Sequence, residues 1–153
     1  MVGHYKHNRN KRKNTKITQA ELNKIAENII AILKEYGVVI QRYNAYSSKS
    51  IYLKFDYGVC NSLRISDHKG KKHLAYRYNI TPEVTHACMN LTKQGWQRHH
   101  FPLHGWEKAA YKILDDREEK IRNYGLGLYK QFMYDNAKNN QDTKGFWQQA
   151  VKV

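Results

Sequence analysis

The sequence predicts an α+β domain: an N-terminal helix packed on a mostly antiparallel four-stranded sheet, followed by a helical C-terminal half. Three observations predict it. A capping box opens an amphipathic helix after residue 17, three runs between residues 51 and 80 alternate apolar with polar side chains, and helical spacing holds from residue 106 onward. A chain of 153 residues is long enough to bury a core in one such domain.

The first helix has clear signals at both ends. Thr18 and Glu21 have the spacing of a capping box, and Ile17 precedes them in the position of a hydrophobic staple. Apolar residues then recur at three- and four-residue spacing as far as Tyr36, and Gly37 suits the left-handed conformation that commonly ends a helix. We expect the apolar stripe of this helix to belong to the core.

The predicted sheet rests on a period of two in the hydrophobic pattern. Residues 38–43 form a β-branched run that predicts the first strand, and three alternating runs follow between Ser50 and Ile80. Gly58 and the lysine-rich turn 67–72 separate these runs, which predicts an antiparallel meander. The side chains expected on its apolar face are Ile51, Leu53, Phe55, Leu63, Ile65, Leu74, Tyr76, Tyr78 and Ile80.

The second half of the chain has two predicted helical segments. A capping threonine, a proline and an acid at 81–83 predict a helix that ends at Gly95. Helical spacing returns over 106–121, and Gly125 interrupts it before it resumes. Residues 96–106, dense in aromatic residues and histidine, are predicted to form a loop between the two segments.

Net charge is the strongest indication of function. The chain has 27 Lys and Arg against 13 Asp and Glu, which gives a net charge of +14 and a pI near 9.8. A positive field of this size favours association with polyanions, nucleic acid first, then an anionic membrane or an acidic protein surface. Twelve tyrosines and three tryptophans add stacking surfaces, which suit single-stranded nucleic acid in particular.

One group of cations lies in the N-terminal segment. Residues 1–16 have no acid and little apolar content, and we expect them to be a disordered tail. The tail either lies along phosphates as an electrostatic arm or only solvates the protein, and we favour the arm. Its cations are Lys6, Arg9, Lys11, Arg12, Lys13 and Lys16. We expect a single domain over 17–135 and a flexible C-terminal tail at 136–153.

A second group of cations belongs to the polar face of the meander. The alternation places Tyr52, Lys54 and Asp56 on that face together with Arg64 and Arg77. The turn between the last two strands adds Lys69, Lys71 and Lys72. Tyrosines 52, 57, 76 and 78 are interleaved with these cations, although some must belong to the core. We predict that this basic, aromatic face binds nucleic acid, with RNA or DNA left open.

Two other functional classes are weighed against binding. A small nuclease or hydrolase would need Asp67 and His68 to converge with His99, His100 and His104, but neighbouring strand residues point to opposite faces. His100 and His104 match half of a zinc spacing, and a close cysteine pair is missing. We therefore predict no metal, no cofactor and no enzymatic activity.

The remaining class is a structural or interaction module, in which residues 96–106 anchor a partner protein. The cysteines, Cys60 and Cys88, are too few and too far apart to form a disulfide framework, which favours a reducing environment. With no signal peptide or membrane-spanning run, we expect a soluble cytoplasmic protein. The oligomeric state is left open.

The order of parts resembles a known family. A basic N-terminal segment, a helix, serines at 47, 48 and 50 before Ile51, and the stretch Leu63-Arg64-Ile65-Ser66-Asp67-His68 are similar to small phage-encoded anti-CRISPR inhibitors of the type II RNA-guided nuclease. The resemblance covers residues 1–80. It implies a phage accessory protein that acts in the bacterial cytoplasm on a nuclease–guide RNA complex, using the basic tail and Arg64. At +14 the protein is not an acidic mimic of DNA.

Overall fold

The computed structural model describes residues 17–67, 73–79, 96–141 and 150–153 and confirms the α+β class. In chain order the elements are α2 (Gln19–Glu35), β1 (Ile40–Asn44), β2 (Ile51–Phe55), the 3-10 turn η1 (Asp56–Gly58), β3 (Ser62–Ser66), β4 (His73–Asn79), β5 (Trp96–Pro102), the 3-10 turn η4 (Leu103–Gly105), α4 (Trp106–Tyr124), α5 (Leu126–Gln141) and β6 (Val151–Lys152). The tail at 1–16, the turn lysines and the helix predicted from residue 81 lie outside the described residues.

The described residues form one antiparallel sheet with the strand order β5-β4-β3-β2-β1-β6. The predicted meander is confirmed as β2, β3 and β4, but the predicted number of four strands is wrong because the sheet has six. Residues 96–102, predicted as loop, form β5 and pair with β4 along its whole length. β6, within the predicted C-terminal tail, pairs with Gln41 and Arg42 of β1. Both errors concern strands that are specified by a distant partner.

Helix α2 begins and ends where its sequence predicts. Thr18 and Glu21 form the reciprocal capping box, in which the Glu21 N–H donates to Thr18 Oγ1 at 3.1 Å and the Thr18 N–H donates to Glu21 Oε1 at 2.8 Å. At the other end Gly37 has φ +80°. The Gly37 and Val38 N–H groups donate back to the carbonyls of Lys34 and Leu33, the arrangement of a Schellman motif.

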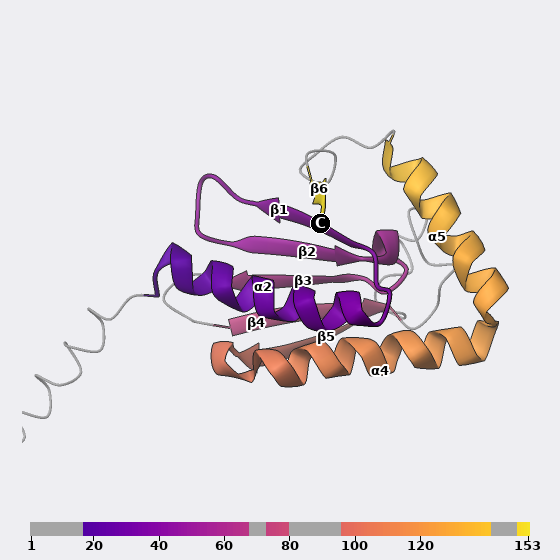
Figure 1. Cartoon of the computed structure of the whole chain (residues 1–153), viewed down its shortest axis with the longest axis horizontal. Helices are drawn as coiled ribbons and strands as arrows, with labels where there is room; N and C mark the ends of the chain where they lie inside the picture. The colour runs from indigo at the N-terminus through magenta and orange to yellow at the C-terminus, as the bar shows by residue number, and fades with distance from the viewer. Residues whose placement is uncertain (1–16, 68–72, 80–95, 142–149) are drawn as a thin grey trace, which may run out of the picture.

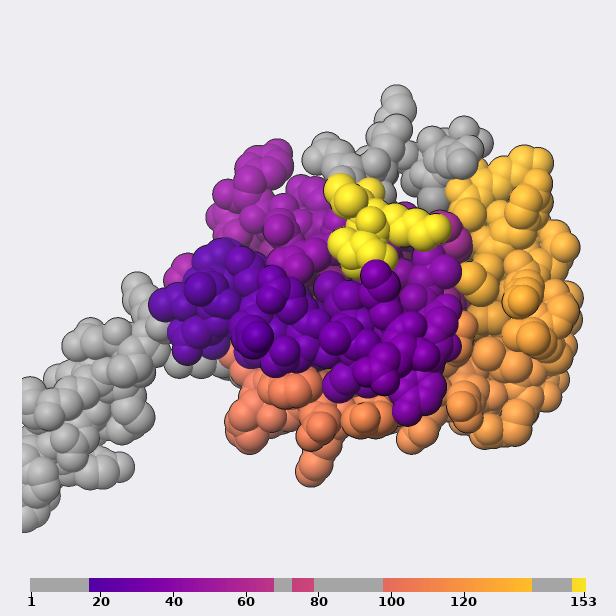
Figure 2. Space-filling model, in the orientation of Figure 1, coloured from indigo at the N-terminus to yellow at the C-terminus, as the bar shows by residue number. Residues whose placement is uncertain are grey.

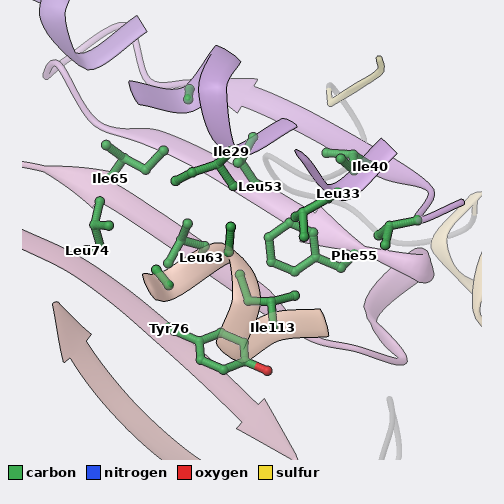
Figure 3. Close-up of a cluster of buried hydrophobic side chains, with 14 of the residues drawn as sticks. Ile29, Leu33, Ile40, Leu53, Phe55, Leu63, Ile65, Leu74, Tyr76 and Ile113 are labelled. Carbon is green, nitrogen blue, oxygen red and sulfur yellow. The ribbon is translucent and has the colours of Figure 1, made fainter. Parts of the chain in front are cut away.

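Helices α2 and α4 cover one face of the sheet, and the core lies beneath them (Figure 1). Figure 3 shows side chains from α2, β1 to β4 and α4 meeting in this layer. The apolar positions predicted for the meander and described by the structure are all buried, namely Ile51, Leu53, Phe55, Leu63, Ile65, Leu74, Tyr76 and Tyr78. Period-two alternation therefore predicted the buried face correctly.

Helices α4 and α5 are separated at Gly125, whose φ of +87° is unfavourable for a residue with a side chain. The predicted interruption is thus confirmed. α5 turns away along the end of the sheet (Figure 1). In the space-filling view α2 lies across the middle of this side, α4 below it and α5 at the right (Figure 2). Helix α5 continues to Gln141, past residue 135, where the sequence analysis placed the end of the domain.

A buried carboxylate joins the end of the sheet to both C-terminal helices. Asp56 follows β2 with φ +50°, which turns its side chain away from the polar face predicted for it and into the interior. Its carboxylate accepts hydrogen bonds from the Val39 N–H at 2.9 Å, Arg117 Nε at 2.5 Å and the Tyr129 hydroxyl at 2.5 Å. Tyr57 also has a positive φ, so this tight connection depends on the contacts that hold it.

Candidate nucleic-acid interface

The face of the sheet opposite α2 and α4, which we call the outer face, carries side chains in two neighbouring rows. The strand register defines each row, because directly opposite residues of antiparallel strands share a face. The aromatic row consists of Tyr43, Tyr52, Arg64, Ala75 and His100. The cationic row consists of Lys152, Gln41, Lys54, Ser62, Arg77 and Arg98.

Charge is divided unevenly between strands and helices. In the described residues, the six strands contain no Asp or Glu, and their cations are Arg42, Lys54, Arg64, Arg77, Arg98 and Lys152. The helices α2, α4 and α5 contain nine acids and nine Lys or Arg, so they carry no net charge. Five of the six strand cations lie on the outer face, which is therefore the positive side of the described domain.

A groove of about 340 Å³ lies on the outer face. It is lined by Tyr52, Ser62, Leu63, Arg64, His73, Ala75, Arg77, Arg98 and His100. Ala75 lies at its centre, because Arg64 and His100 flank it on the adjacent strands while His73 and Arg77 flank it along β4. A methyl group surrounded by four longer side chains leaves a depression with cationic and imidazole walls.

Arg64 is held at the β3 side of this depression. Its guanidinium carbon lies 5.6 Å from the centroid of the Tyr52 ring, a cation–π arrangement that follows from their opposite positions on β3 and β2. One terminal nitrogen lies 3.4 Å from Ser50 Oγ. The buried Nε has no hydrogen-bond partner among the described residues. Tyr52 and Ser50 thus hold the Arg64 side chain where it lines the groove.

The wall of the groove formed by β4 and β5 carries two arginines and two histidines. Arg77 on β4 and Arg98 on β5 are directly opposite, and both are exposed. The rings of His73 and His100 meet edge to face with centroids 5.5 Å apart. Arg77 and Arg98 give this wall of the groove a positive charge, which suits an anionic ligand.

Lys54 occupies the cationic row next to the β2–β3 connection. Burial lowers the pKa of its ammonium group to about 8, because the charged form loses hydration. A Cβ atom added at Gly58 would lie 3.0 Å from Lys54 Cε, so the glycine leaves room for this side chain. A phosphate nearby would favour the protonated form of Lys54.

The predicted site residues meet this geometry in part. Lys54, Arg64 and Arg77 lie on one face, as the alternation predicted, while the predicted tail and turn cations lie outside the described residues. Tyr76 and Tyr78 belong to the core, where their hydroxyls approach Asp116. Sequence reasoning missed Tyr43, Arg98, His100 and Lys152 as members of this face. Alternation of Arg98 and His100 against Phe101 was the available signal for β5.

The residues required by the nuclease alternative do not converge where they are described. His99 points to the core side and stacks on Tyr76 with ring centroids 6.0 Å apart, whereas His100 lies on the outer face. His104 lies in η4, and His68 is outside the described residues. Within the described ranges, no group of three or more His, Cys, Asp or Glu side chains is placed to hold a metal ion.

The segment 96–106 differs from the loop predicted for the interaction-module alternative. It forms β5 and η4, and Trp106, partly buried, packs against the core. Leu103 is buried as well. None of the described helices is long and apolar enough to cross a membrane.

No family model, curated protein or solved structure matches this chain. Its function is therefore inferred from the fold and from the outer face.

Proposed function

We propose that this protein is a non-enzymatic binding protein whose outer face contacts the phosphates of nucleic acid or of a nucleoprotein complex. The observation that carries the proposal is the distribution of charge. Cations from all six strands stand in a part of the structure without any described strand acid, and five of them share one face. A face of one sign attracts polyanions from a distance and holds them at contact.

The distribution favours a ligand over a purely solubilising role. The mixed charges of α4 support a solvated helix, for example through Lys112 and Asp116 at 3.0 Å. The outer face instead places Arg77 opposite Arg98, in described strands that include no Asp or Glu. The depression at Ala75 between these cations also gives the face a specific shape.

The expected affinity is strongly dependent on salt. Each phosphate neutralised on a single strand contributes about 0.7 to the slope of log affinity against log salt concentration. Contacts from Arg64, Arg77 and Arg98 would therefore contribute about 2 to that slope. The predicted arm at 1–16, with six cations, would add a separate and larger contribution.

The sharper form of the proposal is an anti-CRISPR phage protein that inhibits a type II RNA-guided nuclease by contacting the enzyme and its guide RNA or target DNA. The resemblance over residues 1–80 supports it, and the positive outer face is compatible with contact to nucleic acid rather than mimicry of it. The test adds the protein in excess to a guide-loaded nuclease and measures target cleavage. We expect cleavage to fall, and undiminished cutting would contradict this form alone.

The general proposal is tested by binding to short RNA and DNA across a salt series. The full chain is compared with a chain lacking residues 1–16 and with the triple variant Arg64→Gln, Arg77→Gln, Arg98→Gln. Each change should lower the slope, and the two together should lower it further. Arg122→Gln is the matched control, because Arg122 is an exposed arginine on α4. Slopes unaffected by the triple variant would contradict a role for the outer face.

A further inference from the structure

We infer that the groove above Ala75 accepts one unpaired nucleobase, so that the outer face binds single-stranded nucleic acid in preference to duplex. The inference rests on the proposed function and specifies its ligand. In this arrangement the strand of nucleic acid crosses the β-strands, with its bases on the aromatic row and its phosphates on the cationic row. This arrangement is inferred from the order of side chains along the aromatic and cationic rows.

The aromatic row and the cationic row are far enough apart to contact the bases and the phosphates of one strand separately. Along a strand, neighbouring residues of one face lie two positions apart, or about 7 Å. The cationic row presents Lys54, Arg77 and Arg98 and contains no aromatic residue. The aromatic row presents Tyr43 and Tyr52, with ring centroids 6.2 Å apart and planes tilted by 46°. Rings on one side and cations on the other match the two sides of a single strand.

The depression at Ala75 has the width of a stacked base. Arg64 on β3 and His100 on β5 are separated by one intervening strand, so their backbones lie roughly 10 Å apart. A base between a guanidinium plane and an imidazole ring needs two contacts of about 3.5 Å each. Only the Ala75 methyl group lies between them in the row, which leaves room for that stack.

The walls of the depression suit a base better than they suit a phosphate alone. Tyr52 supports the Arg64 guanidinium from the side away from Ala75, since the aromatic row runs Tyr52, Arg64, Ala75 across the strands. The imidazole of His100, an exposed residue that lines the groove, offers polar groups beside it. In a duplex the bases are stacked and paired, so only an unpaired base reaches this position.

The test compares three probes at one salt concentration: a 12-nucleotide single strand, an abasic strand of the same length, and the corresponding duplex. Fluorescence anisotropy gives the affinity of the full chain for each. We expect the normal single strand to bind at least about fivefold more tightly than the abasic strand, as expected for one stacked base. The duplex should also bind less tightly than the normal strand.

The variant Ala75→Leu tests the position of the base. It fills the depression without changing charge, and it should reduce affinity for the normal strand toward that for the abasic strand by the contribution of one stacked base. Affinity for the abasic strand and its salt slope should stay unchanged. Ala31→Leu is the matched control, since Ala31 is exposed on α2, which covers the opposite face of the sheet.

The outcomes separate the inference from the proposed function. Equal affinity of the unmodified protein for normal and abasic strands would overturn the base site while leaving phosphate binding intact, and tighter binding of the duplex would overturn it as well. Failure to bind any of the three probes at low salt would overturn the proposed function. Because the first comparison uses only the unmodified chain, it holds even if Ala75→Leu fails to fold.

Discussion

Arg77 on β4 lies directly opposite Arg98 on β5, on the face of the sheet that no described helix covers. Two like charges in such a pair oppose sheet formation by about 0.2 to 1 kcal/mol. Both arginines are exposed on that face, where a polyanion can contact them. Polyanion binding and the stability of the free protein therefore place opposite demands on Arg77 and Arg98.

Replacing one member of that pair should separate the two demands. Arg98→Thr should leave the protein as stable as before or raise its free energy of unfolding by up to about 1 kcal/mol, because threonine suits a strand and the repulsion is removed. Affinity for a single strand should fall several-fold in the same variant. Denaturant unfolding and anisotropy measure the two effects, and a variant that loses stability while keeping full affinity would contradict the interpretation.

The lowered pKa of Lys54 predicts a pH dependence of binding. Its amine loses its proton as the pH rises through about 8, and a neutral amine no longer attracts phosphate. Affinity should therefore decline between pH 7 and pH 9. Lys54→Arg keeps the charge throughout this range and should remove the decline. A decline of the same size in both proteins would assign it to another group.

The buried carboxylate of Asp56 should be important for stability. Asp56→Asn leaves Arg117, whose side chain is 15 % exposed, without its anionic partner. The free energy of unfolding should fall by about 3 kcal/mol. Tyr129→Phe removes one hydrogen bond to the same carboxylate and should lower it by about 1 to 2 kcal/mol. Tyr134→Phe, on the exposed side of α5, is the control and should have little effect.

Cys60 predicts how stability changes in alkaline solution. Burial, and next the charge of Asp56, raises the pKa of its thiol from 9.0 to about 12. Between these values the unfolded chain releases a proton that the folded chain retains, so the free energy of unfolding falls as pH rises. Above pH 9 the contribution approaches about 1.4 kcal/mol per pH unit.

The variant Cys60→Ala isolates that contribution. It should be less stable than the unmodified protein at pH 7 because it leaves a small cavity in the core. The difference should shrink between pH 9 and pH 10 as the unmodified protein loses the thiol contribution. Tyr76 and Tyr129, whose pKa values are also raised by burial, add to the loss in both proteins at higher pH. A constant difference across this range would contradict the assignment.

The features that could be predicted from sequence are those with local signals. Thr18, Glu21 and Gly37 define α2 through hydrogen bonds within a few residues, and the alternation in 51–79 defines which side of the meander is buried. The same alternation placed Lys54, Arg64 and Arg77 on one face, because a period of two fixes the polar side once the apolar side is known.

The remaining features depend on partners distant in sequence. The apolar alternation of β5 is weak, since its core side carries His99 as well as Phe101, and its pairing with β4 determines its conformation. Arg98 and His100 were missed with it. Asp56 was assigned to the polar face because the alternation passes through it, but a positive φ and the distant residues Arg117 and Tyr129 place it inside.

The most direct test of a phosphate-binding outer face is an NMR titration of the full chain with a short single strand at low salt. Backbone amides of β3, β4 and β5, including Arg64, Ala75 and Arg98, should shift most, while those on the outward side of α2 should shift least. Shifts that are confined to α2 and α4, or shifts absent at excess oligonucleotide, would contradict the account.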